Sequence, residues 1–350
     1  MKSFYGYTHK NFQFSVKFYE YVMKKVINGK RMYLFFDEIQ IVDHWEEAVN
    51  SFFVDLDADI YITGSNSKML SSEISSLLTG RYIQFRLYPL TFKEMIEFRL
   101  KLGKPDTYDE QLWAFIRRGG FPMVHISDYD ESTSYRIIND IYDSIVLRDV
   151  VQRFSIRNVE LLSRIVKFVI DNIGNTFSAK SISDYFKSQN RKVDINTIYN
   201  YIDALESSFV INKVNRYDVH GKEILKTQEK YYLADQGIQH AIFGYKDRNI
   251  SGVLENIVYN ELIMRGYTVY VGKIQDLEID FVAERKNEKV YVQVAYKMGN
   301  ESTIDREFKP LLMVKDHYPK YVVSMDIHFI DNIEGIQHMY LGDFIRSDLF

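Results

Sequence analysis

The chain has 350 residues, enough for two or three domains, and its 46% hydrophobic and 26% charged residues are typical of proteins with ordinary soluble cores. A net charge of −4 excludes a generally basic surface for nucleic acid, so such a contact needs a local patch. The absence of cysteine excludes disulfides, thiolate nucleophiles and cysteine-ligated metals. No apolar run approaches the ~20 residues of a membrane span and no signal peptide is recognisable, so we expect a cytoplasmic protein without membrane partners.

The first predicted elements alternate between helix and strand. Apolar residues recur at helical spacing over Phe14–Ile27, and the apolar run Met32–Phe36 is typical of a parallel strand buried on both faces. A helix over Trp45–Phe53 and a second buried strand over Ile60–Thr63 follow. This alternation predicts a parallel α/β sheet, and in such sheets ligands bind at the carboxyl ends of the strands.

Polar residues follow both predicted strands. Asp37 and Glu38 come directly after the first strand, and Asn66 follows the second within a Gly-Ser-Asn-Ser sequence. An Asp at a strand end can hold Mg²⁺, the next Glu can orient an attacking water, and an Asn one strand over can sense a γ-phosphate. The pattern therefore favours nucleotide hydrolysis. The alternative is that the two acids begin a loop and the serines cap a helix.

The stretches LFFDEIQIVDHWEEAV and ITGSNSKMLSSEISSLLTGRYIQFRLYPLTFKEM resemble a prokaryotic group of AAA-type P-loop ATPases. The similarity extends through Arg118–Pro122 and, more loosely, to the C-terminus. The resemblance implies ATP and Mg²⁺ as cofactors, Walker B roles for Asp37 (Mg²⁺) and Glu38 (catalysis), and a sensor role for Asn66. Arg81 matches an arginine of the family's pattern. It could act as an arginine finger towards a neighbouring subunit of a homo-oligomer, or be a surface arginine at a turn.

The chain also departs from that family. A phosphate-binding loop reads G-x-x-x-x-G-K-[ST], and none of the 350 residues forms this motif. In the family the loop precedes the Walker B strand, so we expect residues 1–98 to be a partial ATPase core that lacks the first strand, loop and helix. Truncation, a frameshift, a start codon assigned too far downstream and a pseudo-ATPase are the competing explanations. We expect weak or absent ATP hydrolysis.

The middle of the chain is predicted to be helical and then to form a winged helix. Helical patterns over 91–117 and 135–151 predict a helical lid at residues 99–154. Three helices and two strands predict a winged helix at residues 155–244, and they cover Val159–Ile173, Ala179–Ser188, Ile195–Ser207, Val210–Tyr217 and Glu229–Leu233. The third helix offers Asn196 and Asn200 to DNA but no Lys or Arg. DNA binding and protein contacts therefore remain alternatives for this unit.

The last third follows the order helix, three strands, helix, strand. The elements are predicted over Gly252–Arg265, Tyr267–Val271, Glu278–Ala283, Val290–Tyr296, Ile304–Val314 and Tyr321–Ser324. This order resembles the restriction-endonuclease-like fold, which implies metal ligation by Glu255 and Asp280. Gln293 and Ala295 stand where that fold carries its E-x-K acid and lysine, and Lys297 is a doubtful substitute. We therefore expect a nuclease-like frame at residues 245–350 without nuclease activity, or a plain α/β domain.

The sequence thus predicts an α/β protein with a partial P-loop NTPase parallel sheet, a helical lid, a winged helix and a restriction-endonuclease-like α/β domain. The leading functional interpretation is an AAA-type, ATPase-like protein. The alternative is a non-enzymatic DNA-binding or adaptor protein that uses the winged helix and the nuclease-like frame.

Overall fold

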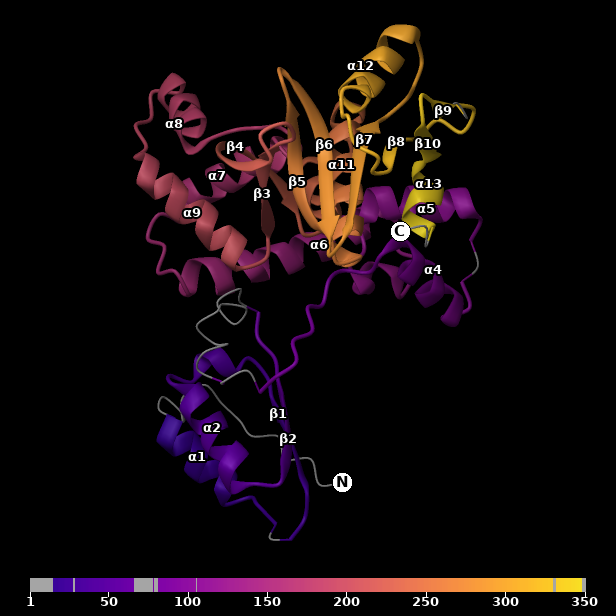
Figure 1. Cartoon of the computed structure of the whole chain (residues 1–350). Coiled ribbons are helices and arrows are strands. Elements are labelled where there is room, and N and C mark those ends of the chain that lie inside the picture. Colours follow the sequence, from indigo (N-terminus) through magenta and orange to yellow (C-terminus); the bar gives the residue numbers. More distant parts are fainter. Residues whose placement is uncertain are drawn as a thin grey trace. The chain divides into compact units, whose positions relative to one another are not determined.

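The computed structural model describes residues 15–27, 29–65, 78, 81–104, 106–329 and 332–347. The chain divides into two compact units, whose elements are labelled in Figure 1. The first comprises the described residues up to Arg86 together with Ser207–Phe209, and the second comprises Leu87–Glu206 and the chain from Val210 onward. Within the described ranges no helix has both the length and the apolar character that crossing a membrane requires.

The first unit contains two parallel strands and two helices. Its elements are α1 (Ser15–Met23), β1 (Met32–Phe36), the short helix η1 (Ile39–Ile41), α2 (Trp45–Asp55) and β2 (Ala58–Ile62). Strands β1 and β2 pair in parallel, with Met32 opposite Ala58 and Phe36 opposite Ile62. The helices pack on one face of this pair, and their shared core consists of Phe18, Val22, Leu34, Ile39, Trp45, Ala48, Val49, Phe52 and Leu78.

The opposite face of β1 and β2 is exposed. Tyr33, Phe35 and Tyr61 are 56%, 65% and 51% exposed, and the rings of Phe35 and Tyr61 stack with centroids 4.8 Å apart. Successive side chains of a strand point to opposite faces, so Leu34 and Phe36 of β1 point to the other face and pack with the core of the helices. The prediction that this strand is buried on both faces is therefore wrong.

The second unit is built on a sheet whose described strands follow the order β4-β3-β5-β6-β7-β8-β10-β9. The strands are β3 (Ile211–Asp218), β4 (Glu223–Leu233), β5 (Thr268–Ile274), β6 (Leu277–Arg285), β7 (Glu288–Ala295), β8 (Lys320–Ser324), β9 (Asn332–Ile333) and β10 (Ile336–Tyr340). Neighbouring strands are antiparallel except for the parallel pairs β3–β5, β7–β8 and β8–β10.

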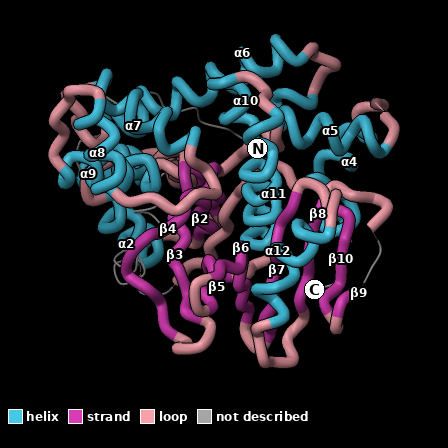
Figure 2. Tube along the Cα trace, turned by 90° about the horizontal axis from the view of Figure 1, so that it is seen from above, coloured by secondary structure: helices cyan, strands magenta, loops and turns pink. Residues whose placement is uncertain are grey.

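Helices cover both faces of this sheet. They are α4 (Phe92–Lys101), α5 (Tyr108–Arg118), α6 (Glu131–Ser144), α7 (Val159–Asp171), α8 (Ala179–Ser188), α9 (Ile195–Ser207), α10 (Gly237–Phe243), α11 (Ile250–Met264), α12 (Glu301–Leu312) and α13 (Leu341–Arg346), with a π-helix over Ile145–Gln152. Figure 2 shows α11 and α12 against strands β6 and β7. Along β7, Val292 joins the core shared with α11, and Tyr291 joins the core shared with α12. The two helices therefore pack on opposite faces.

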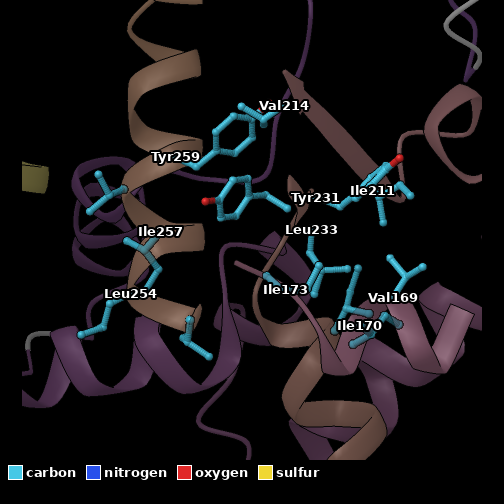
Figure 3. Close-up of a cluster of buried hydrophobic side chains, with 14 of the residues drawn as sticks. Val169, Ile170, Ile173, Ile211, Val214, Tyr231, Leu233, Leu254, Ile257 and Tyr259 are labelled. Atoms are coloured by element: carbon cyan, nitrogen blue, oxygen red, sulfur yellow. The ribbon is translucent and has the colours of Figure 1, made fainter. Parts of the chain in front are cut away.

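The predicted winged helix and the predicted nuclease-like segment share one sheet and one core. The hairpin β3–β4 is the predicted pair of wing strands, and Arg216–Asp218 of β3 pair in parallel with Val271–Lys273 of β5. Figure 3 shows side chains of both segments in a single cluster: Val169, Ile170, Ile173, Ile211, Val214, Tyr231, Leu233, Leu254, Ile257 and Tyr259. The hairpin thus bridges the helices α7–α9 and the sheet that follows.

Candidate functional site

The first candidate site lies where β1 and β2 end. The parallel pairing continues beyond the strands, because the Thr63 N–H donates to the Phe36 carbonyl at 2.8 Å and the Ile39 N–H donates to the Thr63 carbonyl at 3.3 Å. Asp37 and Glu38 therefore lie beside Thr63 and Ser65, at the carboxyl ends of both strands.

Hydroxyl groups from the second strand hold both carboxylates. Thr63 Oγ1 donates to Asp37 Oδ1 and accepts from the Glu38 backbone N–H at 3.1 Å. Ser65 Oγ donates to Glu38 Oε2 at 2.9 Å, and Gln40 Nε2 donates to the same oxygen. Glu38 has φ 51°, in the left-handed region that non-glycine residues seldom adopt. Asp37 is exposed to solvent. Two positioned, accessible carboxylates result.

This donor set fits a magnesium ion. Mg²⁺ binds oxygen ligands and commonly uses one or two carboxylates together with waters and substrate phosphates. Asp37 offers a solvent-facing carboxylate of that kind. Arg81 is also exposed, and its backbone N–H donates to the Leu78 carbonyl at 3.2 Å. Asn66 lies outside the described residues.

The second candidate site is a cluster of three carboxylates around a buried lysine in the second unit. Lys230, on β4, is 3% exposed. Its Nζ lies 3.2 Å from Glu255 Oε2, 2.7 Å from Glu278 Oε1 and 3.5 Å from Asp280 Oδ1. Glu255 comes from α11 and the other two acids from β6. The structure therefore brings Glu255 and Asp280 to the same lysine ammonium.

Further hydrogen bonds fix the acids of this cluster. Tyr232 Oη donates to Glu255 Oε2 at 3.1 Å, and the Val294 N–H donates to Asp280 Oδ2 at 2.8 Å. Gln293 Oε1 accepts from the Asp280 N–H at 3.2 Å, while Gln293 Nε2 donates to Glu307 Oε2 at 3.0 Å. The neutral amide at the predicted acid position thus bonds to protein groups on both sides.

Burial and charge act in opposite directions on these groups. Burial by itself lowers the pKa of Lys230, but attraction by Glu255, Asp280 and Glu278 outweighs it and raises that pKa above its usual value. Burial raises the pKa of Glu255, against the lowering effect of Lys230. Burial, and then repulsion by Glu255, raise the pKa of Asp280 well above its usual value. Lys230 is therefore a charged group at neutral pH.

A cleft of about 470 Å³ opens beside this cluster. Its lining includes Glu255, Glu278, Asp280 and Glu307, against the basic residues Lys297 and Arg306. Glu307 pairs with Arg306 at 2.6 Å. The Lys297 Nζ lies 5.2 Å from the centroid of the Tyr296 ring, and the side chain is exposed. Ala295, at the predicted lysine position, is buried.

Lys230 is the residue of this cluster that sequence reasoning missed. It lies 25 residues before Glu255, on a strand predicted to be part of a wing. The one signal in the sequence is the position of this lysine inside the predicted strand Glu229–Leu233. A lysine that is buried in a sheet usually has an acidic partner. The sequence analysis also did not identify Thr63 and Ser65 as hydrogen-bond donors to Asp37 and Glu38.

Another buried carboxylate, that of Asp235, contacts the Arg-Gly-Gly-Phe-Pro turn after α5. Asp235 Oδ2 accepts from the Gly120 N–H at 2.6 Å, and Oδ1 accepts from the Gly237 N–H at 2.7 Å. Burial raises the pKa of Asp235 to about 7, although both hydrogen bonds oppose the rise. A Cβ on Gly119 would lie 1.7 Å from Asp235 Oδ1. The absence of a side chain at Gly119 thus allows the close approach of a buried acid that joins the segment between β4 and α10 to the end of α5.

Two family models match separate parts of the chain. Residues 4–96 match a family described as "AAA domain", and residues 109–249 match a domain of unknown function (DUF8612). An uncharacterized protein of Haemophilus influenzae is 36% identical over 94% of this chain and 81% of its own length.

More distant relatives come from Methanocaldococcus jannaschii. Two uncharacterized proteins of this organism are 34% and 21% identical, over 79% and 63% of this chain. The chain spans 63% and 50% of their respective lengths. Among solved structures, a Walker-type ATPase of Pyrococcus abyssi aligns with a TM-score of 0.36 and 14% identity, over 60% of this chain and 62% of that one.

Proposed function

We propose that the first unit is a nucleotide-binding module with its Mg²⁺ site at the ends of β1 and β2. The chain belongs to the same family as the uncharacterized Haemophilus influenzae protein, and its residues 4–96 match the AAA domain family. The observation that carries this proposal is the pair of positioned carboxylates, Asp37 and Glu38, held by hydroxyls of the neighbouring parallel strand.

The residues at the ends of β1 and β2 would have different roles. Asp37, which is exposed and oriented by Thr63, would hold the cation, and ATP·Mg²⁺ would supply the phosphoryl group. Glu38, oriented by Ser65 and Gln40, would position the attacking water. Asn66 would sense the γ-phosphate, and Arg81 would act towards a neighbouring subunit of a homo-oligomer.

We propose that this 350-residue polypeptide binds ATP weakly and hydrolyses it slowly. Its sequence contains no G-x-x-x-x-G-K-[ST] motif, and such a loop supplies the backbone N–H groups and the lysine that bind phosphates. The carboxylates alone attract the cation of ATP·Mg²⁺ and leave most of the triphosphate in water.

Binding of ATP·Mn²⁺, followed through water-proton relaxation, tests this function. We expect weak binding that is lost in Asp37→Ala. The matched control is Asp43→Ala, which removes another exposed carboxylate of the same unit and should bind like the wild type. Binding that Asp37→Ala leaves unchanged would contradict the site. Micromolar affinity that Asp37→Ala abolishes would instead overturn the proposed weakness.

The second candidate function is DNA binding or adaptor activity by the second unit. The order of three helices and a hairpin favours it, because α7, α8 and α9 precede β3–β4 as in a winged helix. The exposed surface of α9 includes Asn196, Tyr199 and Asn200, and Lys192 before the helix is exposed. Residues 155–235 contain 12 basic and 10 acidic residues, so any attraction to phosphates is local.

Gel shifts with duplex DNA at increasing salt concentration test this candidate. DNA binding would weaken as salt rises and would weaken further in Lys192→Ala. Lys315→Ala removes another exposed lysine of the same unit and serves as the control. If no duplex binds in a salt-dependent way, the DNA version is excluded and the adaptor version remains.

A further inference from the structure

We propose that Lys230 is the resident cation of the acidic cluster in the second unit, where its ammonium takes the position that a divalent metal would hold between Glu255 and Asp280. The nuclease-like frame would then be metal-independent. This inference concerns a different unit from the proposed nucleotide site and does not depend on it.

The geometry of the ammonium carries the proposal. A lysine ammonium has three N–H donors, and three carboxylate oxygens surround Lys230 Nζ at 2.7–3.5 Å. These oxygens come from Glu255 on α11 and from Glu278 and Asp280 on β6. The ammonium therefore lies among the acids, where a shared metal ion would have to be, instead of beside them.

The remaining polar groups of the cluster are directed at protein partners. Glu255 Oε2 also accepts from Tyr232 Oη, and Asp280 Oδ2 accepts from the Val294 N–H. The oxygen of Gln293, the residue at the predicted third ligand position, accepts from the Asp280 N–H. A metal ion bound by these groups would have to displace both the lysine and these hydrogen bonds.

Electrostatics agree with this arrangement. A lysine that is 3% exposed is rare unless it is paired, because its ammonium loses its hydration. The three carboxylates compensate that loss, because each places an oxygen within 2.7–3.5 Å of the ammonium. In return the ammonium lowers the electrostatic cost of burying Glu255 and Asp280 together. The residues therefore do not fit a vacant metal site.

The cleft beside the cluster then has a different character from a metal-dependent active site. Three of its acidic residues, Glu255, Glu278 and Asp280, already pair with the ammonium of Lys230. The fourth, Glu307, pairs with Arg306. A ligand in this cleft would meet side chains that are fixed by internal ion pairs.

Manganese binding to the full chain, measured by the loss of the free Mn²⁺ signal in electron paramagnetic resonance, tests the proposal. Variants Lys230→Ala, Lys230→Arg and Lys230→Ala combined with Asp280→Asn are compared with the wild type. We expect at least tenfold tighter Mn²⁺ binding in Lys230→Ala than in the wild type, loss of that gain when Asp280→Asn is added, and no gain in Lys230→Arg, which keeps a cation.

Thermal unfolding covers the case in which Lys230→Ala folds poorly. Mn²⁺ should then raise its melting temperature, because the metal replaces the missing ammonium, and should leave that of the wild type unchanged. Should the variant fail to fold even with Mn²⁺, Glu278→Gln is added to reduce the uncompensated charge, and the same gain in Mn²⁺ binding over the wild type is expected.

Two results would overturn the proposal. One is stoichiometric Mn²⁺ binding by the wild type that Asp280→Asn abolishes, since metal and lysine would then occupy the cluster together. The other is a folded Lys230→Ala variant, with or without Glu278→Gln, that gains no affinity for Mn²⁺. Mn²⁺ binding that responds to Asp37→Ala alone belongs to the first unit and leaves the cluster free of metal, as proposed.

Discussion

The two units carry pairs of carboxylates with opposite environments. Asp37 and Glu38 lie at the open end of two parallel strands, where hydroxyls hold them and Asp37 faces solvent. Glu255 and Asp280 lie inside the larger sheet unit, where an ammonium lies between them. The first pair is available to a cation from solution, whereas the second already has one from the chain. In our proposals, similar residue types therefore serve cation binding in one unit and internal structure in the other.

The largest expected effect is on the second pair. Removing one partner of a buried ion pair costs about 3–5 kcal/mol, so Lys230→Ala should lower the free energy of unfolding of the second unit by roughly that amount. Each unit has its own tryptophan, Trp45 and Trp113, so a Trp45→Phe background lets Trp113 fluorescence report urea unfolding of the second unit alone.

Lys213→Ala is the matched control for that prediction. Lys213 pairs with Glu229 at 3.1 Å on the neighbouring strand, but its side chain is 32% exposed. Its loss should cost less than about 1 kcal/mol, as for other partly exposed pairs. If Lys230→Ala and Lys213→Ala lowered the free energy of unfolding equally, burial would not explain the importance of Lys230.

A pH titration gives the next largest effect, through Asp235. Its pKa is raised from 3.8 to about 7 in the folded protein, so the folded state binds the proton more tightly than the unfolded chain. Its stabilising contribution is full below about pH 4 and is lost as the pH rises through about 7, a change of roughly 2–4 kcal/mol. The urea midpoint of the second unit should therefore fall with rising pH over that window.

Asp235→Asn isolates this group from Glu255, Glu261 and Asp280, buried acids whose pKa values are also raised. The amide cannot ionise, so its unfolding midpoint should depend less on pH than that of the wild type. It also has one acceptor oxygen in place of two for the Gly120 and Gly237 N–H groups, so the variant should be less stable at low pH. Identical pH slopes would exclude Asp235 as the source.

A pair of glycine substitutions gives a smaller effect. Gly119 and Gly103 both have φ 73°, but a Cβ on Gly119 would overlap Asp235, whereas a Cβ on Gly103 would have no atom within 4 Å. Both alanine variants carry backbone strain, and only Gly119→Ala must also displace a buried carboxylate. We expect Gly119→Ala to be less stable than Gly103→Ala by about 2 kcal/mol in urea unfolding. Equal stabilities would show that Asp235 can shift freely.

The smallest effect is expected at the exposed pair. Asp37→Ala should change the free energy of unfolding of the first unit by less than about 1 kcal/mol, because the exposed carboxylate loses one hydrogen bond and exchanges it for water. Trp45 fluorescence in a Trp113→Phe background measures this unit. A loss as large as that of Lys230→Ala would mean that Asp37 is structural, and the contrast between the two units would fail.

Local patterns predicted the elements of both units well. The strand Met32–Phe36 and the helices Ala179–Ser188 and Ile195–Ser207 have the predicted bounds. Helical spacing and capping residues such as Ser178 are local signals that one sequence displays fully. Pro310 lies inside α12, so this proline does not end the helix.

Long-range packing was less predictable. The exposure of Phe35 depends on which elements cover β1, and the pairing of Arg216 with Val271 depends on tertiary contacts. The resemblance named Glu255 and Asp280 as metal ligands, which stays a prediction. It did not name Lys230, because a buried lysine on a strand has the same local pattern as an exposed one. Only the fold brings its ammonium to acids on two other elements.

The most direct measurement is the anomalous difference map of a crystal soaked with MnCl₂, which locates bound manganese without reference to activity. The account predicts that Lys230 occupies the centre of the cluster and that no manganese peak lies within ligand distance of Glu255 or Asp280. Any manganese bound by the carboxylates of these two sites should lie at Asp37. A manganese peak coordinated by Asp280, with Lys230 displaced or beside it, would contradict the account.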